Sequence, residues 1–561
     1  MSRCILFVIL LSWLPLAATD SKPKPTPANK AYSTFEDAHY SGSGVCADCH
    51  DGLSTSTGED ISIVTHWSNS MMAHSGIDPY WMAKVASELK RNPQLASTIN
   101  DKCSRCHLPM ANDAASKNGD PVVILASDNG FLDPGNAYNA HAQEGVSCTL
   151  CHQIADSPDL GTLNGFSGQW QVNSYTNLVD RPAFGQYANP LTTPMRNQVN
   201  YTPQPGAHTT DSSLCASCHD LNTPILDANG NVVSTTPDTE FPEQSPYREW
   251  AHSAYADNGA TPARCQDCHM PEVNEPVKIS TRPSNLGSRS NFSRHTFLGA
   301  NSVMLQILLE NNLAPTASDL PGYIQQVRTF LQQAGQIRFK RAVMVDGLLI
   351  ADVEVLNHSG HKLPTGYPSR RVWIDFEVTD LNGTTLFRSG APNADGSIQH
   401  VDLDSNPYAP EPHYDEITDA TQVQVYEPIM ADTDGNVTHT LLRAASYVKD
   451  NRLLPAGFDP ATAPADIAVH GQAATDDDFI AGGDTVTYRI QLPPADGYFI
   501  EARLRYQTLS FGHLQDLFTD SNLPEVADFE GMFANASLRH ELIDQTSTTP
   551  VDDVIFRNGF E

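Results

Sequence analysis

A five-residue pattern, Cys-x-x-Cys-His, occurs five times between residues 46 and 269. Two thiols a short turn apart can add to the two vinyl groups of one porphyrin, and the adjacent imidazole can bind its iron; this is the attachment chemistry of c-type haem. The pattern predicts five covalent haems, each with one proximal histidine. The residues are Cys46, Cys49 and His50; Cys103, Cys106 and His107; Cys148, Cys151 and His152; Cys215, Cys218 and His219; and Cys265, Cys268 and His269.

Other uses of these cysteines fit the pattern less well. With eleven Cys and twenty His in 561 residues, roughly 0.01 copies are expected by chance. Zinc ribbons use an even number of cysteine pairs and need no histidine after each pair. Disulfides within Cys-x-x-Cys are strained and easily reduced. Ten of the eleven cysteines lie in the motifs, and the remaining one, Cys4, precedes the predicted mature start.

The N-terminus has the pattern of a secretory signal peptide over residues 1–19. Arg3 is followed by an apolar run from Ile5 to Leu16 and then by the small residues Ala17-Ala18-Thr19. Cys4 precedes the apolar run, so no lipid-anchored cysteine is indicated. No other segment reaches the roughly 18 continuous apolar residues of a membrane span. We therefore expect a periplasmic or extracellular protein with no membrane span.

Composition divides the rest of the chain. Residues 20–33 are rich in Pro and Lys and predict an extended linker. Residues 34–300 are rich in Cys, His, Met, Gly and Pro, which predicts short helices and coil packed around haems. The clearest helix there is Pro79–Leu89. Residues 301–335 predict a helical connector that is broken between Pro315 and Pro321.

From residue 336 the hydrophobic period becomes two. This change predicts a β domain over residues 336–515, an antiparallel β-sandwich of immunoglobulin-like type, with a C-terminal tail over 516–561. Asn382-Gly383 is a hairpin turn signal within it. The predicted strands are Leu348–Leu356, Val372–Thr379, Thr384–Arg388, Thr485–Leu492 and Phe499–Tyr506.

Each iron also needs a second axial ligand. Three histidines precede the first cysteine of a motif by seven residues, and two flank the segment Trp67–Met72, whose methionines could serve instead. Another precedes the predicted connector helix. The preferred distal candidates are His74, His141, His208, His295 and His361, and the alternatives are His39, His66 and His252.

His361 lies in a loop, residues 357–371, that directly follows a predicted strand. Two Gly and two Pro restrict the loop backbone, which is a way to present one side chain rigidly. A rigid turn with surface histidines is the alternative. The loop also carries Lys362, Arg370 and Arg371, whose charges suit haem propionates. We therefore expect the β domain to deliver His361 to a haem.

The five motifs resemble secreted bacterial multihaem c-type cytochromes, together with the segments Trp67–Met72, Cys265–Pro271 and Gly360–Gly366. This broad group includes electron-transfer cytochromes of nitrogen-cycling and metal-respiring bacteria. The resemblance covers roughly residues 40–510. It implies respiratory or extracellular electron transfer through mostly bis-histidine haems, with redox partner proteins or an extracellular electron acceptor.

Ligand supply favours an electron carrier over an enzyme. A catalytic haem keeps one axial position open, whereas the candidates here suffice to fill every iron. The chain also lacks Cys-x-x-Cys-Lys, the lysine-ligated site that the resembling nitrite reductases use. A haem oxidoreductase acting on a small nitrogen or sulfur compound, and a structural subunit of an extracellular cytochrome assembly, are the alternatives. The formal net charge of −32 disfavours nucleic acid and anionic lipid as partners.

Overall fold

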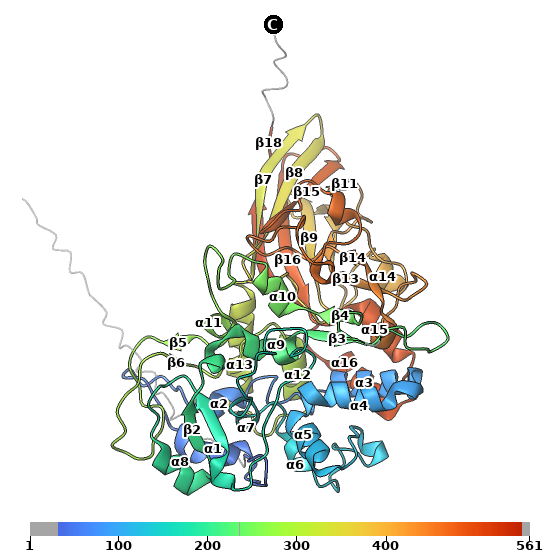
Figure 1. The fold of residues 1–561 in the computed structure, drawn as a ribbon. Helices are drawn as coiled ribbons and strands as arrows, with labels where there is room; N and C mark the ends of the chain where they lie inside the picture. The colour runs from blue at the N-terminus through green and yellow to red at the C-terminus, as the bar shows by residue number, and fades with distance from the viewer. Residues whose placement is uncertain (1–31, 235, 553–561) are drawn as a thin grey trace, which may run out of the picture.

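The computed structural model describes residues 32–234 and 236–552. The predicted signal peptide, most of the predicted linker and Cys4 lie outside these residues. None of the described helices is both long and apolar enough to span a bilayer. Figure 1 shows blue and green helices at one end of the molecule, with most of the yellow and orange strands of the β domain standing above them.

The N-terminal half consists of short helices joined by long loops. The helices are α1 (Ser43–His50), α2 (Ile63–Trp67), α3 (Pro79–Arg91), α4 (Ala96–His107), α5 (Pro109–Asn118), α6 (Asn139–Gln143), α7 (Cys148–Cys151), α8 (Thr192–Val199), α9 (Ser212–His219), α10 (Pro246–Ala251) and α11 (Cys265–His269). The strands are β1 (Pro182–Gly185), β2 (Thr202–Pro205), β3 (Leu221–Thr223), β4 (Phe241–Gln244), β5 (Glu272–Val273) and β6 (Phe292–Ser293). The predicted helix over 79–89 is confirmed as α3.

Each Cys-x-x-Cys-His motif lies at the C-terminal end of a helix. The motif histidine is the last residue of α1, α4, α9 and α11, and it directly follows α7. Because residues i and i+3 lie on one face of a helix, both cysteines of a motif point the same way. The helix ends beside the histidine, so the imidazole can turn toward the same side as the thiols.

The connector forms α12 (Ser302–Glu310) and α13 (Leu320–Leu331), with the predicted break between them. Asp319 caps α13 through a hydrogen bond from the Gly322 backbone N–H, and Pro321 lies in the first turn, where proline costs no helical hydrogen bond. Both helices bury apolar side chains against each other and against neighbouring segments. The connector is therefore a packed part of the fold.

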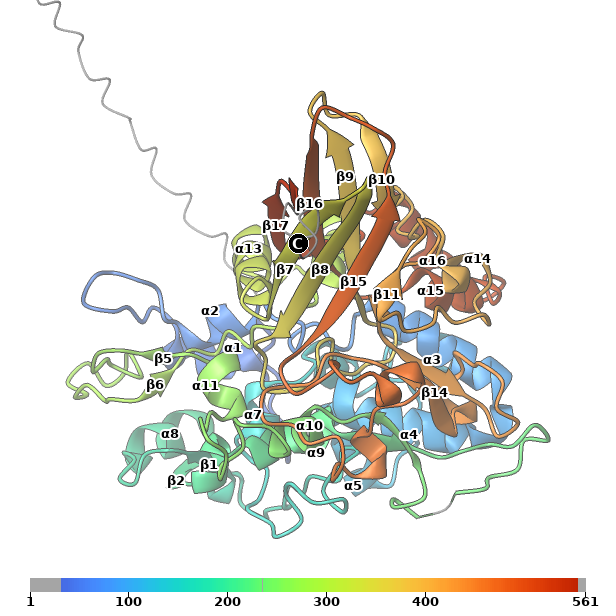
Figure 2. The same ribbon diagram turned by 90° about the horizontal axis from the view of Figure 1, so that it is seen from above.

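The β domain contains two five-stranded sheets, which Figure 2 shows from above. One sheet has the order β10-β9-β16-β17, with β12 also paired to β9, and the other has the order β11-β15-β8-β7-β18. The bounds are β7 (Gly335–Val345), β8 (Leu348–Asn357), β9 (Arg371–Asp380), β10 (Thr385–Ser389), β11 (Glu416–Ile417), β12 (Val425–Tyr426), β15 (Gly483–Gln491), β16 (Tyr498–Gln507), β17 (Glu541–Thr548) and β18 (Val551–Asp552). Outside the sheets lie α14 (Asp402–Ser405) and the pair β13 (Pro428–Ala431) and β14 (Ser446–Asp450).

The alternating residues of the central strands form one shared core. Val353, Phe376, Val486 and Leu504, from one strand each of β8, β9, β15 and β16, are fully buried in it. Phe376 of one sheet stacks on Tyr488 of the other with ring centroids 3.9 Å apart. The predicted strands are confirmed. Two edge pairings, β11 with β15 and β18 with β7, are parallel, so the sheets are not purely antiparallel.

Residues 516–552 are more than the expected tail. They contain the end of α15 (Phe511–Phe518), then α16 (Pro524–Asn535), and strand β17, which pairs with β16. Val526, Phe529 and Phe533 recur at helical spacing and pack with Tyr80 of α3. The C-terminal segment therefore completes a sheet and joins the β domain to the N-terminal half.

Candidate haem site

All five motifs line one cavity of about 1970 Å³. Its wall includes every motif cysteine and every motif histidine, with apolar side chains between them. None of these described cysteines forms a disulfide. Free thiols and imidazoles around one large apolar space form the donor set that covalently attached haem requires.

The motifs, numbered in chain order, are not adjacent in that order. The Cys46 thiol of the first motif contacts Cys148 of the third. Contacts between Cys106 and Cys218, and between Cys215 and Cys265, place the fourth motif between the second and the fifth. The pKa of the Cys151 thiol, in the third motif, is raised to about 12, first by burial and then by the charge of Cys218. The five motifs therefore form one connected group, in which the fourth motif is linked to the second, the third and the fifth.

Backbone carbonyls orient four of the motif histidines. The ring Nδ1 atoms lie 2.8 Å from Ile279 O for His50, 3.3 Å from Ser75 O for His107, 2.6 Å from Phe184 O for His152 and 2.5 Å from Leu298 O for His269. An Nδ1–H donated to a carbonyl leaves Nε2 as the atom with a free lone pair. Each of these rings is thus held in the tautomer that binds a metal through Nε2.

Burial lowers the pKa of all five motif histidines, to about 4 for His107 and His269. The imidazoles are therefore neutral at pH 7, as metal ligands must be. Trp81 of α3 stacks on His107 with ring centroids 4.6 Å apart and fixes the ring from one side. Sequence reasoning placed Trp81 in a helix but did not predict this contact.

Two of the distal candidates lie opposite motif histidines across the cavity. His295 and His152 have ring centroids 6.3 Å apart with planes 26° apart, and His361 and His269 have centroids 6.4 Å apart with planes 15° apart. The Nδ1 of His295 lies 3.1 Å from Ser293 O, and that of His361 lies 2.9 Å from Lys362 O. All four rings therefore use Nδ1 for a backbone carbonyl and leave Nε2 free.

The six other candidates do not line the cavity among the described residues. His74 is buried, donates a ring N–H to the backbone of Ser68 and has no partner at Nε2 within the described chain. This is the same division of ring nitrogens as in the four opposed histidines. His252 is exposed, and its Nδ1 lies 2.8 Å from Arg248 O.

The three histidines placed seven residues before a motif have varied surroundings. The His141 Nε2 lies 2.5 Å from Asp37 Oδ2, and the His208 Nε2 lies 2.9 Å from Ile154 O. Each of these rings, like that of His39, has a buried Nδ1 with no partner among the described residues. His66 likewise places Nε2 3.0 Å from Asp60 O and has a buried Nδ1 without a partner in the described chain. The three histidines thus share an unpartnered Nδ1, although none of them lines the cavity in the described structure.

The loop around His361 differs from the expected propionate site. The Lys362 side chain is fully buried with its Nζ 2.7 Å from Asp450 Oδ2, and Arg371 is fully buried against both oxygens of Asp404. Both cations are therefore neutralised inside the β domain and do not reach a propionate. Arg370 does line the cavity, and its Nη1 donates to Gly366 O at 2.8 Å.

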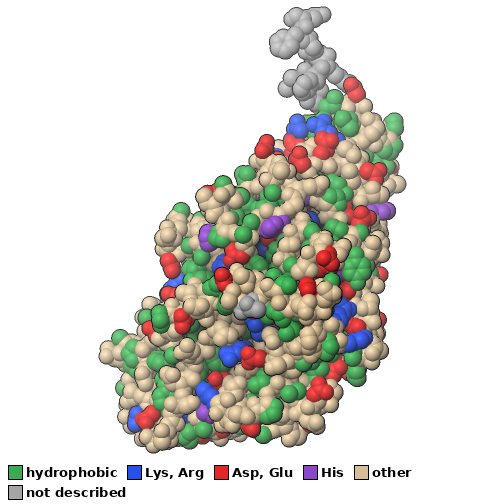
Figure 3. Space-filling view, turned by 45° about the vertical axis from the view of Figure 1, so that its right-hand side comes forward, with side chains coloured by type: hydrophobic (Ala, Val, Ile, Leu, Met, Phe, Trp, Pro, Cys, Tyr) green, Lys and Arg blue, Asp and Glu red, His purple; other side chains and the backbone are tan. Residues whose placement is uncertain are grey.

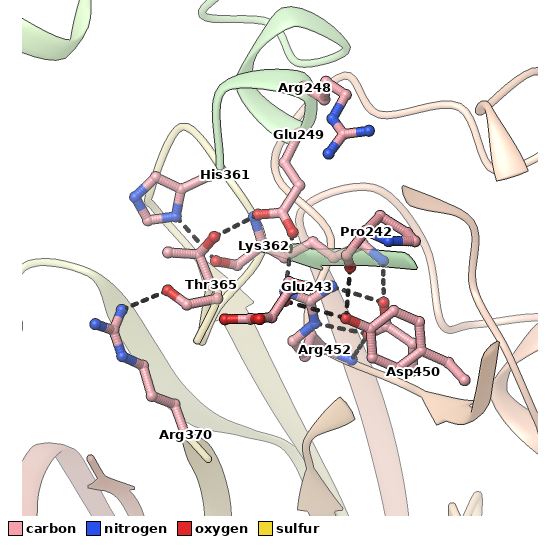
Figure 4. Close-up of polar contacts among 12 residues, drawn as sticks. Pro242, Glu243, Arg248, Glu249, His361, Lys362, Thr365, Arg370, Asp450 and Arg452 are labelled. Carbon is pink, nitrogen blue, oxygen red and sulfur yellow. Dashed lines mark hydrogen bonds and ion pairs between the residues drawn. The ribbon is translucent and has the colours of Figure 1, made fainter. Parts of the chain in front are cut away.

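Glu249 of α10 fastens this loop to the N-terminal half, as Figure 4 shows. Its Oε2 accepts hydrogen bonds from the Lys362 backbone N–H at 3.1 Å and from the Thr365 hydroxyl at 2.6 Å. Its Oε1 lies 2.9 Å from Arg452 Nη1, and Arg452 in turn binds Asp450. Two buried acids and two buried bases thus form a closed group behind His361. No spacing in the sequence indicated it, because Glu249 and Lys362 are 113 residues apart.

The comparisons with known proteins found a match among solved structures. No family model matches the chain, and no curated protein matches it. A solved structure, the penta-heme cytochrome c552 from Thermochromatium tepidum, matches with a TM-score of 0.50 and 16% sequence identity, over 92% of this chain and 100% of that chain. The chain therefore has a multihaem-cytochrome-like fold, and this likeness extends across the N-terminal half and the β domain.

Proposed function

We propose that this chain is an exported c-type cytochrome that holds five haems and passes electrons along them. The observation that carries the proposal is two pairs of opposed histidines, His152 with His295 and His269 with His361. Two imidazoles that bind one iron from opposite faces, at iron–nitrogen distances of about 2 Å, have ring centroids about 6 Å apart. The ring separations in the structure agree with this value, and the free Nε2 atoms supply the ligands.

Filled axial positions favour electron transfer over catalysis. Each haem, when bound, supplies a one-electron iron centre, and two protein ligands leave no position for a substrate. His74 is proposed as a further distal ligand because its buried Nε2 lacks a partner in the described chain. His141 and His208 are proposed for the remaining irons because each has a buried Nδ1 without a partner in the described chain.

The proposed partners are redox proteins or an extracellular electron acceptor. With a net charge of −32, basic partners are attracted at long range and salt slows the encounter. On the face that Figure 3 shows, acidic and basic side chains are interspersed. The attraction on that face is therefore general, without one dominant acidic patch.

Intact-mass measurement tests the cofactor count. The mature protein from cells with a haem-attachment system should carry five haem additions and no free thiol, because all ten cysteines of the motifs line the cavity. The double variant Cys265→Ala with Cys268→Ala should carry one addition fewer, which assigns that haem to the fifth motif. Four or fewer additions in the unaltered protein contradict the proposal.

Low-temperature paramagnetic resonance of the oxidised protein separates carrier from enzyme. A carrier should give low-spin iron only, since every axial position is filled. A high-spin signal that shifts on addition of nitrite or hydroxylamine would instead support a haem oxidoreductase.

A further inference from the structure

One buried carboxyl on the cavity wall has no ion-pair partner within the described part of the chain. Glu243, in β4, is 4% exposed and lines the cavity, and its Oε2 has no hydrogen-bond partner among the described residues. Figure 4 shows Glu243 beside Arg452, which belongs to the closed group of buried acids and bases behind His361. An ionised carboxylate buried without a partner costs several kcal/mol, so this site favours the protonated acid.

The charged groups around Glu243 come from several elements and do not neutralise it. The charge of Glu243 interacts with Glu88 and Lys84 of α3 and with Lys102 and Cys103 of α4. It also acts on three tyrosines, Tyr80, Tyr367 and Tyr447. Both lysines have other partners. Lys84 Nζ lies 2.9 Å from Glu88 Oε1, and Lys102 Nζ lies 2.7 Å from Glu240 Oε2.

The result is a carboxyl that titrates near neutral pH. Burial, and then the like charge of Glu88, raises the pKa of Glu243 to about 8 against the opposing effect of the two lysines. A carboxyl with this pKa exchanges its proton in response to a modest change of nearby charge.

Of the five motifs, the second is the one whose residues the charge of Glu243 affects. After burial, the charge of Glu243 is the largest influence that raises the pKa of Cys103. Trp81 and Lys84 lie on the same face of α3, one turn apart, and Trp81 stacks on His107. Glu243 thus belongs to the wall around the second motif.

We propose that Glu243 binds a proton when the haem of the second motif is reduced, so that this electron-transfer step is coupled to proton uptake. The inference rests on the proposed function, since it requires a haem at that motif. One electron arrives at the iron from a reduced partner, and one proton arrives at the Glu243 carboxylate from solvent; on reoxidation both leave. Reduction adds a negative charge to the cavity and strengthens proton binding, and by linkage the bound proton raises the haem potential equally.

The proposed coupling determines how the reduction potential of this haem changes with pH. Below the pKa of the oxidised state Glu243 is protonated before and after reduction, so the potential is flat. As pH rises through the window near 8, proton uptake accompanies the electron and the potential falls. The limiting slope is about 59 mV for each tenfold change in proton concentration, for one electron and one proton.

Haem-resolved redox titration of the full holoprotein between about pH 6 and 10 tests this coupling. One haem should show a falling potential in the unaltered protein, and Glu243→Gln should make the potential of that haem independent of pH while the other haems keep theirs. Asp238→Asn is the matched control, because Asp238 lies five residues away on the same segment but is exposed; it should keep the slope. An equal slope in Glu243→Gln and the unaltered protein overturns the proposal.

A second measurement does not depend on the variant folding. Reduced-minus-oxidised infrared spectra of the unaltered protein at about pH 8 should show a carboxylic acid band gained on reduction. Absence of that band overturns the coupling while leaving the proposed function intact. Absence of a haem at the second motif by mass and absorption overturns the proposed function itself, so the two failures are distinguishable.

Discussion

His361→Ala should leave one iron in five without its second imidazole and produce a high-spin signal from that haem alone. The expected haem is that of the fifth motif, because His361 faces His269 with ring centroids 6.4 Å apart. Loss of a nitrogen donor opens an axial position to water and removes a ligand that stabilises the oxidised iron. The reduction potential of that haem should therefore rise, while the low-spin signals of the others remain.

His358→Ala is the matched control for this variant. His358 lies in the same loop and is exposed, three residues before His361. Its replacement should leave the spin state and the potentials of all haems unchanged. If His361→Ala keeps every haem low-spin with unchanged potentials, the loop is structural, and the missing ligand must be sought among His39, His66, His74 and His252.

Local pattern was enough to predict much of this site. The motifs indicate their own chemistry because two thiols and an imidazole must be close in sequence to bind one porphyrin. The helix over 79–89 and the strands after residue 336 followed from hydrophobic period, which depends only on which face is buried. The loop at His361 was recognisable because two Gly and two Pro restrict its backbone directly after a strand. Gly366 also lies in close contact with β4, since a Cβ there would lie 2.3 Å from Gln244 Cβ.

Long-range partners were not predictable in the same way. Lys362 was expected to pair with a haem propionate because of its charge and its place in the loop. It is buried because Asp450, 88 residues away, binds it at 2.7 Å, and no local spacing encodes that pairing. The same limit applies to the distal histidines. A separation of seven residues places His141 and His208 near their motifs, but the direction of each ring depends on contacts with Asp37 and Ile154.

The sequence of the C-terminal segment contains a helical pattern that did not enter the prediction. Val526, Phe529 and Phe533 have helical spacing, yet the segment is short and follows a run of strands. Its role became evident only where α16 packs on α3, a helix from the N-terminal half of the chain. Helix period identifies a buried face, whereas the surface that buries it depends on the fold.

Asp450→Asn should be among the most destabilising single changes at the junction between the two halves. Asp450 is 1% exposed and binds Lys362 Nζ at 2.7 Å and Arg452 at 2.7 and 2.8 Å. The amide cannot balance these charges, so two buried cations would share only Glu249. Removing one member of a buried ion pair costs about 3–5 kcal/mol. Urea unfolding of the holoprotein, followed by circular dichroism, measures this loss of unfolding free energy.

The pH dependence of the same group gives an independent check. Burial alone would raise the pKa of Asp450, but Arg452 and Lys362 hold it well below the ordinary value of 3.8. Because the folded-state pKa is the lower one, the stabilisation is complete above about pH 5 and is lost as pH falls toward the folded pKa. The difference in unfolding free energy between the unaltered protein and Asp450→Asn should therefore shrink on acidification.

Glu354→Gln is the matched control for Asp450→Asn. Glu354 pairs with Arg338 and Lys340 at the surface, where Arg338 is 56% exposed. Solvent screens such pairs, so this change should cost about 0–1 kcal/mol. A loss of less than about 1 kcal/mol for Asp450→Asn as well would contradict a structural role for the buried group. Since Lys362 follows His361 directly, Asp450→Asn should also broaden the low-spin signal of the fifth-motif haem, which Glu354→Gln should leave unchanged.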